Sequence, residues 1–210
     1  MRTHHLPPVL RQHLAALRML LVFTVLTGIA YPLLVTGIAQ TAFPHQANGS
    51  LVMTNGKPVA SRLLGQNFAL PKKNPDDVTE PLRADPKWFQ PRPSAGGYDP
   101  LASGASNLGP NSRELIRAVR ERRAAVAAFD GVQPASVPVD AVTASGSGLD
   151  PAISPAYAYE QVHRVANARR LAPAKVGKLV ADHVQGRVLA FLGQESVNIV
   201  ELNHDLAGLM

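Results

Sequence analysis

The apolar residues of this chain are concentrated in one stretch near the N-terminus. Residues 19–39 read MLLVFTVLTGIAYPLLVTGIA and carry no charged side chain. At about 1.5 Å of rise per residue, a helix of this length spans the roughly 30 Å hydrocarbon core of a bilayer. The pattern therefore predicts a transmembrane helix within residues 14–39. A cleavable signal peptide is the alternative, but the apolar region of such a peptide is shorter, about 7 to 15 residues.

Positive charge is distributed unevenly around this stretch. The N-terminal side carries three arginines, Arg2, Arg11 and Arg18, whereas the other side has no Lys or Arg before Lys57. Cytoplasmic flanks of membrane helices are enriched in Lys and Arg. We therefore predict that residues 1–13 are cytoplasmic and that residues 40–210 are extracytoplasmic.

Two features inside the predicted span indicate contact with a partner helix. Gly28 follows Thr24 by four residues, and small residues at this spacing let helix backbones approach closely. Pro32 removes a backbone hydrogen bond, which costs about 3 kcal/mol in a soluble helix, whereas neighbouring helices or a local kink compensate for it in membranes. Gly28 and Pro32 are therefore candidate contact residues, although small residues also occur by chance in such spans.

Beyond the span, the pattern changes to short apolar runs separated by turn residues. Residues 50–65 place two such runs on either side of Asn55-Gly56, a dipeptide that favours the type I′ turn of a β-hairpin. Seven prolines follow between residues 71 and 100, so neither a helix nor a central strand can persist there. We expect this irregular stretch to be functional, ordered by a partner or flexible.

The next amphipathic segment begins at Asn111 or Ser112, either of which can cap a helix, and ends near Phe129. Its apolar positions fall on one face, formed by Leu115, Val119, Val126 and Phe129. Its basic residues fall largely elsewhere and are typical of a solvated face: Arg113, Arg117, Arg120, Arg122 and Arg123.

Two more helices and a β-rich segment complete the prediction. Ser154-Pro155 opens a helix that runs to Arg170. Its inward residues are Tyr159, Val162 and either Val165 or Ala166. Pro173 opens another, with Val176, Leu179 and Val180 toward the core and His183 as a further candidate. Residues 186–203 read as two antiparallel β-rich runs joined at residues 193–196. The fold class is therefore α+β: one transmembrane helix followed by a single domain.

Composition and charge exclude several classes of protein. The 210 residues include no cysteine, which removes thiolate nucleophiles, cysteine zinc sites and iron–sulfur ligation. The net charge of +6 is compatible with nucleic-acid binding, but aromatic residues make up only 5% of the chain. Because stacking platforms are scarce and the domain is predicted to be extracytoplasmic, we expect no nucleic-acid partner.

A search for catalytic motifs finds none. Ser145 and Ser147 lie among glycines, but the nucleophile elbow G-x-S-x-G fails because Ser145 and Leu149 stand where it needs glycine. A tight turn is the favoured interpretation, and an anion-binding nest of backbone N–H groups is the alternative. Neither G-x-x-x-x-G-K-[ST] nor G-x-G-x-x-G occurs, so the chain has no phosphate loop of its own.

The remaining titratable residues do not suggest a reactive centre either. His163, His183 and His204 lack the spacing of metal ligands, and Asp140 and Asp150 stand beside prolines as turn or cap residues. We therefore predict no catalytic residue and no metal ligand in this chain.

Several segments together resemble the KdpC family, the C subunit of bacterial Kdp potassium-transporting P-type ATPases. The matching segments follow the same order over nearly the whole chain: YPLL (31–34), QANGSL (46–51), LLGQNF (63–68), FQPRPSA (89–95), SGASNLGPN (103–111), VPVDAVTASGSGLDPAIS (137–154), RVANARRL (164–171) and LGQESVNIVELN (192–203).

The resemblance implies an accessory subunit of the bacterial inner membrane that does not itself hydrolyse ATP. Its implied partners are a channel-like potassium-binding subunit, a P-type ATPase subunit and a small single-helix subunit, with membrane lipid around the span. ATP and potassium would act in those partners, and no cofactor is assigned to this chain. The family is described as an assembly factor and "catalytic chaperone" that raises the ATP affinity of the ATPase subunit. An extracytoplasmic domain cannot reach a cytoplasmic nucleotide, so we expect any effect on ATP binding to be indirect.

On this hypothesis, the loops at residues 89–95 and 103–111 dock onto the partners. Arg92, Tyr98 and Asn107 are the candidate interface residues, and stabilisation of loops within the domain is the alternative role for them. Gln161 is the only residue offered for ligand sensing or cofactor binding. The competing functional classes are an anchored extracytoplasmic hydrolase that uses Ser145 or Ser147, and an anchored binding protein.

Overall fold

The computed structural model describes residues 7–74, 77 and 80–209. The chain divides between Ser50 and Leu51 into two compact units, which are described separately.

The first unit is dominated by one long apolar helix. Helix α1 (Pro8–Val25), a π-helical turn (Leu26–Ala30) and α2 (Tyr31–Ala42) follow one another without a break, and a short helix, α3 (Pro44–Ala47), comes next. The most apolar 18-residue window of the helix Pro8–Ala42 has a mean hydropathy of 2.1, and none of the residues in this window is buried. Among the described residues, it is the one helix long and apolar enough to cross a membrane.

The π-helical turn lies directly before the proline. The Tyr31 N–H donates to the Leu26 carbonyl, five residues back instead of four. Because Pro32 has no N–H and its ring crowds the preceding turn, the wider turn lets the helix continue through it. The local adjustment predicted for this proline is therefore present within the chain itself.

The second unit opens with the predicted hairpin. Strand β1 (Leu51–Thr54) pairs antiparallel with β2 (Lys57–Ser61), and Thr54 faces Lys57 across the turn. Asn55 and Gly56 have φ angles of 51° and 76°, the left-handed values that a type I′ turn requires at both positions. The hairpin prediction is confirmed.

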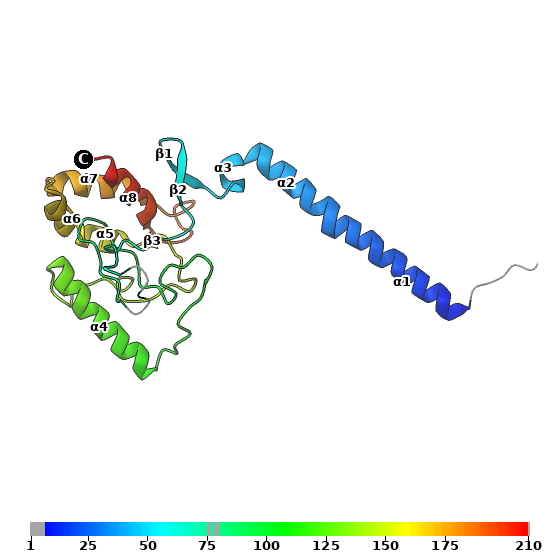
Figure 1. Ribbon diagram of the computed structural model, residues 1–210, viewed down its shortest axis with the longest axis horizontal. Coiled ribbons are helices and arrows are strands. Elements are labelled where there is room, and N and C mark those ends of the chain that lie inside the picture. The colour runs from blue at the N-terminus through cyan, green and yellow to red at the C-terminus, as the bar shows by residue number, and fades with distance from the viewer. Residues whose placement is uncertain (1–6, 75–76, 78–79, 210) are drawn as a thin grey trace, which may run out of the picture. The chain divides into compact units, whose positions relative to one another are not determined.

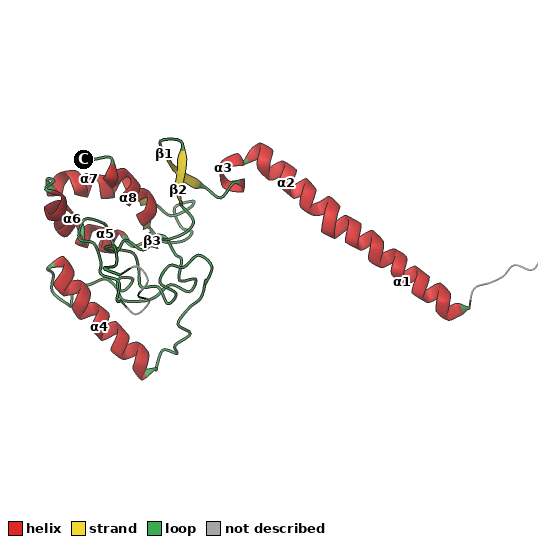
Figure 2. Cartoon of the chain, viewed as in Figure 1, coloured by secondary structure: helices red, strands yellow, loops and turns green. Residues whose placement is uncertain are grey.

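The rest of the described unit combines a small sheet with helices and long loops (Figures 1 and 2). The antiparallel sheet has the order β3-β5-β4, from strands β3 (Ala152–Ile153), β5 (Ser196–Asn198) and β4 (Val184–Gln185). The helices are α4 (Arg113–Asp130), α5 (Pro155–Glu160), α6 (Val162–Arg169), α7 (Pro173–His183) and α8 (Ile199–Ala207). The α+β class is confirmed, and the described part of the proline-rich segment 71–100 contains no helix or named strand.

The core of this unit is formed where α5, α6, α7 and α8 meet the small sheet. Its fully buried side chains come from several elements: Phe89, Val165, Val176, Val180, Val197, Ile199, Leu202 and Leu206. Phe89 differs from the others because it belongs to a loop and not to a helix or strand, as does Val142, which is 1% exposed. The loop therefore contributes to the core as a structural element in its own right.

Local capping fixes two helix starts where the sequence predicts them. The Ser112 hydroxyl accepts a hydrogen bond from the Leu115 N–H, and the Ser154 hydroxyl accepts one from the Tyr157 N–H. On α4, four of the five arginines are exposed, as predicted, and only Arg122 is half-buried, donating to the Val142 carbonyl.

Two sequence predictions about these elements are wrong. The helix predicted from Pro155 to Arg170 is interrupted at Gln161, and Tyr159 is 45% exposed whereas Tyr157 is buried. The first β-rich run, predicted from residue 186, forms no named strand, because β4 ends at Gln185. The second run ends at Asn198, where the side-chain oxygen accepts from the Val200 and Glu201 N–H groups and starts α8. This cap, followed by an amphipathic sequence, outweighs the β propensity of residues 199–203.

Candidate functional site

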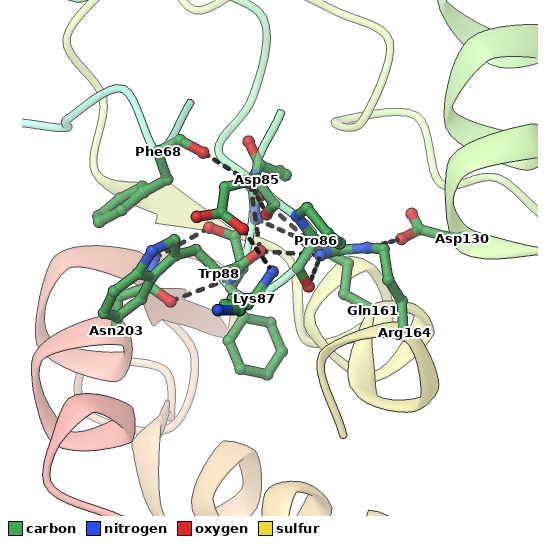
Figure 3. Close-up of polar contacts among 11 residues, drawn as sticks. Phe68, Asp85, Pro86, Lys87, Trp88, Asp130, Gln161, Arg164 and Asn203 are labelled. Atoms are coloured by element: carbon green, nitrogen blue, oxygen red, sulfur yellow. Dashed lines mark hydrogen bonds and ion pairs between the residues drawn. The ribbon is translucent and has the colours of Figure 1, made fainter. Parts of the chain in front are cut away.

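A segment without regular secondary structure, residues 85–90, is held by side chains from α6 and α8 (Figure 3). Two side-chain amides hold its backbone. Asn203, on α8, accepts from the Phe89 N–H at 3.0 Å and donates to the Phe89 carbonyl at 2.9 Å. Gln161 does the same for Gln90, accepting from its N–H at 2.6 Å and donating to its carbonyl at 3.1 Å. Each amide thus satisfies the backbone N–H and carbonyl of one residue, as a neighbouring strand would in a sheet.

Arg164, on α6, joins this segment to α4. Its guanidinium donates to the Asp130 carboxylate at 2.6 Å and to the Gln161 side-chain oxygen at 2.6 Å. It also donates to the backbone carbonyls of Pro86, at 2.7 Å, and Trp88, at 2.9 Å. The Phe129 ring lies 4.4 Å from the guanidinium carbon. One buried cation therefore connects α4, α6 and the backbone of residues 85–90 (Figure 3).

A second arginine completes the attachment at the surface. Arg169 donates to the Lys87 carbonyl at 2.7 Å, and its guanidinium lies 4.2 Å from the centre of the Trp88 ring. Burial lowers the pKa of Arg169, and the Asp85 carboxylate opposes this effect. We call residues 85–90, with Asp130, Gln161, Arg164, Arg169 and Asn203, the anchored segment.

Burial shifts the pKa values of two carboxylates in or near this network, Asp130 and Glu160. Desolvation raises the pKa of Asp130, and the hydrogen bond and charge of Arg164 oppose the rise. Glu160 has no cation of this kind: burial, with the charges of Asp130 and Asp140, raises its pKa to about 7. One of its carboxylate oxygens is buried and has no hydrogen-bond partner among the described residues.

Replacing Glu160 with Gln is expected to stabilise the chain at pH 8 and to have little effect at pH 5. Between the unfolded pKa of 4.5 and the folded value of about 7, the folded state holds a proton that the unfolded state releases, so wild-type stability falls as pH rises through this window. We expect a gain of about 1 kcal/mol, since solvent screens the partly exposed side chain. Thermal unfolding at both pH values measures it. Glu121→Gln, on the exposed face of α4, is the control, and an equal pH dependence of both variants would contradict the prediction.

Two of the candidate interface residues form a separate cluster. Arg92 pairs with Asp150 at 3.0 Å and donates to the Thr143 carbonyl at 3.4 Å. The Tyr98 hydroxyl donates to the Arg92 carbonyl at 2.7 Å, and burial raises the pKa of this hydroxyl. The Tyr98 ring lies against Gly65, where an added Cβ would come within 2.5 Å of it. Both residues therefore stabilise loops within the domain, the alternative role considered from the sequence.

The other candidates are dispersed. Asn107 is exposed and has a left-handed backbone, with φ at 52°. Gly28 and Pro32 are exposed on the apolar helix. Gln161 is fully buried, and its amide is bonded on both sides within the anchored segment. Direct ligand binding by Gln161 stays a prediction, as do the partner contacts of the five interface candidates, Gly28, Pro32, Arg92, Tyr98 and Asn107.

The glycine-rich turn supports the structural interpretation and gives no support to the hydrolase alternative. The buried Ser145 hydroxyl accepts from the Gly148 N–H at 2.8 Å, and the Ser147 hydroxyl accepts from the Leu149 N–H at 3.1 Å. Asp140 accepts from both the N–H and the hydroxyl of Ser154. These residues bond to backbone and caps, as the turn and cap predictions require.

The structure brings together two histidines that the sequence places far apart. His183 on α7 and His204 on α8 contact opposite oxygens of Asp205, at 3.1 Å and 2.9 Å. The other His204 nitrogen lies 3.0 Å from the Thr54 hydroxyl. Within the described part of the chain, no group of three or more His, Cys, Asp or Glu side chains is arranged to hold a metal ion. The cluster joins α7, α8 and the hairpin.

Comparison with known proteins covers both the apolar helix and the α+β domain. A family model described as "KdpC: K+-transporting ATPase, c chain" matches residues 13–208. A Kineococcus radiotolerans protein named "Potassium-transporting ATPase KdpC subunit" is 52% identical over 197 residues, covering 93% of this chain and 92% of its own length. Proteins of the same name from Streptomyces avermitilis and Sorangium cellulosum are 48% and 52% identical, over 93% and 92% of this chain and 93% and 95% of their own lengths.

The architecture is thus that of a transporter subunit with one membrane-type helix and one small α+β domain. The chain belongs to the KdpC family of potassium-transporting ATPase subunits. The resemblance identified from the sequence is confirmed, and as a subunit the chain has partner subunits.

Proposed function

We propose that this chain is a non-hydrolysing accessory subunit of the Kdp complex that drives potassium uptake. The observation that carries the proposal is the family match over residues 13–208, which includes most of the apolar helix and the described domain through α8. The polar side chains best placed for chemistry, in the anchored segment and the glycine-rich turn, are occupied by internal hydrogen bonds.

The proposed location is the bacterial inner membrane, with the N-terminus in the cytoplasm and residues 40–210 outside. The support is the arginine-rich flank before the helix and the absence of Lys and Arg between Arg18 and Lys57. The helix would lie among lipid and beside the channel-like subunit, which it would contact through Gly28 and Pro32. The P-type ATPase subunit and a small single-helix subunit complete the proposed complex.

The proposed role is to stabilise the assembled complex and thereby to raise the ATP affinity of its ATPase subunit. With the domain outside the membrane, this effect is indirect, because the nucleotide is cytoplasmic. A rigid domain supports such a role: the anchored segment ties the proline-rich loops to α4, α6 and α8 through buried charged and amide groups.

Affinity purification of the full chain in mild detergent tests this function. We expect a P-type ATPase subunit and a channel-like subunit to co-purify, and potassium-stimulated ATPase activity to collapse at low ATP concentration when the chain is removed. Purification of the chain without other subunits, together with full ATPase activity of the transporter that lacks it, would refute the role.

Because the chain has no cysteine, single cysteines at Gln12 and Ala124 test the orientation. An impermeant maleimide applied to intact spheroplasts should label only the second. Labelling of Gln12→Cys alone would show that the orientation is the opposite one.

A further inference from the structure

One turn of the domain presents apolar side chains to solvent. Residues 187–192, here called the apolar turn, read RVLAFL and lie between β4 and β5. Val188, Leu189 and Phe191 are 67%, 74% and 69% exposed, and Leu192 is exposed as well. No other run of five described residues in the second unit exposes four large apolar side chains. Contiguous apolar exposure of this kind marks an interaction site.

The apolar turn has a defined backbone. The Val188 N–H donates to the Leu192 carbonyl at 3.0 Å, and the Leu192 N–H donates back to the Val188 carbonyl at 2.9 Å. Leu189 and Ala190 at the tip have φ angles of 52° and 68°, a left-handed conformation that is unfavourable for residues with a Cβ. The backbone hydrogen bonds therefore define where the apolar side chains leave the tip, which lowers the entropy cost of ordering the turn on binding.

Charge distinguishes a protein partner from the lipid surface. Elements that lie on membranes combine apolar residues with several Lys or Arg residues that attract anionic lipids. Residues 186–196 carry only Arg187 and Glu195, so the formal charge of this region is zero. A neutral, rigid tip with a central aromatic ring fits the apolar core of a protein interface, where aromatic residues are enriched and charges depleted.

We infer that the apolar turn is the docking element by which this domain binds an apolar pocket on another subunit of the potassium-transporting ATPase. This inference rests on the proposed function, which places the chain in that complex. It moves the main contact away from the loops that carry Arg92 and Tyr98, because these two side chains bond within the domain. Leu189 and Phe191 would be its principal anchors, since a few central apolar side chains carry most of the affinity of an interface.

Substitution in the full complex tests the inference. Leu189→Ser with Phe191→Ser is expected to lower the yield of co-purified partner subunits at least tenfold after detergent extraction, as for loss of interface anchors. The matched control is Leu82→Ser with Leu101→Ser, two exposed leucines elsewhere, of which Leu101 is 94% exposed. The control should keep the wild-type yield. Thermal unfolding of each purified chain shows whether the variant remains folded. Wild-type recovery with the double variant would overturn the inference.

A photo-crosslinking residue at position 191 gives a second test that keeps an aromatic side chain in place. We expect a crosslink to another subunit of the complex, identified by mass spectrometry. A crosslink to lipid alone, or none in the intact complex, would overturn the inference. Failure of the wild-type chain to co-purify with any subunit would instead refute the proposed function, so the two failures are distinguishable.

Discussion

Replacing Arg164 with Met should destabilise the domain by about 3–5 kcal/mol, the range measured when one partner of a buried ion pair is removed. The change leaves the Asp130 carboxylate buried without its cation and the Pro86 and Trp88 carbonyls without their donor. Because most domains are stable by only about 5–15 kcal/mol, this loss approaches complete unfolding.

Trp88 makes this loss directly measurable. It is the only tryptophan of the chain and lies in the anchored segment, so its fluorescence reports the attachment itself. Chemical unfolding of the full chain in detergent gives the free energy. Arg164→Lys keeps the charge but not the planar fork of donors, and we expect it to recover only part of the stability. Arg117→Met, on the exposed face of α4, is the control. A loss of less than about 1 kcal/mol for Arg164→Met would contradict the ion-pair account.

Asn203→Leu is expected to be the next most damaging change, at about 2–4 kcal/mol. Leucine has the same branched arrangement of heavy atoms as asparagine but cannot hydrogen-bond, so the N–H and carbonyl of the fully buried Phe89 would lose their partners. Each buried group left without a partner costs about 1–3 kcal/mol. Phe89 would then be free to leave the core, although no contact of its ring has been altered.

The same unfolding measurement distinguishes the loss of these two hydrogen bonds from the general effect of an Asn→Leu substitution on a helix. Asn167→Leu, at an exposed position of α6, is the matched control and should change stability by less than about 0.5 kcal/mol. Asn203→Asp retains the acceptor for the Phe89 N–H but loses the donor, so we expect intermediate stability. Equal stability of Asn203→Leu and the control would show that the backbone of residues 85–90 does not depend on this amide.

Elements defined by local signals were predictable from the sequence. Asn55-Gly56 specifies a turn by its own backbone preference, and Ser112 and Ser154 cap helices within three residues of themselves. The start of α8 was missed although a signal was present. Asn198 is followed three residues later by Glu201, a pattern typical of a helix start, but the β-branched run around it favoured a strand.

The anchored segment could not be predicted, because its contacts join distant parts of the chain. The Asn203 amide bonds a residue 114 positions away, and the Gln161 amide bonds one 71 positions away. Neither spacing has a sequence signature. The one available signal is a polar side chain on an otherwise apolar helix face, as for Asn203 between Leu202 and Leu206, and such a residue indicates burial without naming its partner.

The π-helical turn before Pro32 has a consequence for the way the membrane helix meets its surroundings. A wide turn contains about one extra residue, so every side chain after it is rotated by roughly 100° from its position on an uninterrupted α-helix. A single stripe drawn along Pro8–Ala42 therefore changes side halfway. The half that ends at Val25 and the half that begins at Tyr31 can therefore present the same kind of face to two different neighbouring helices.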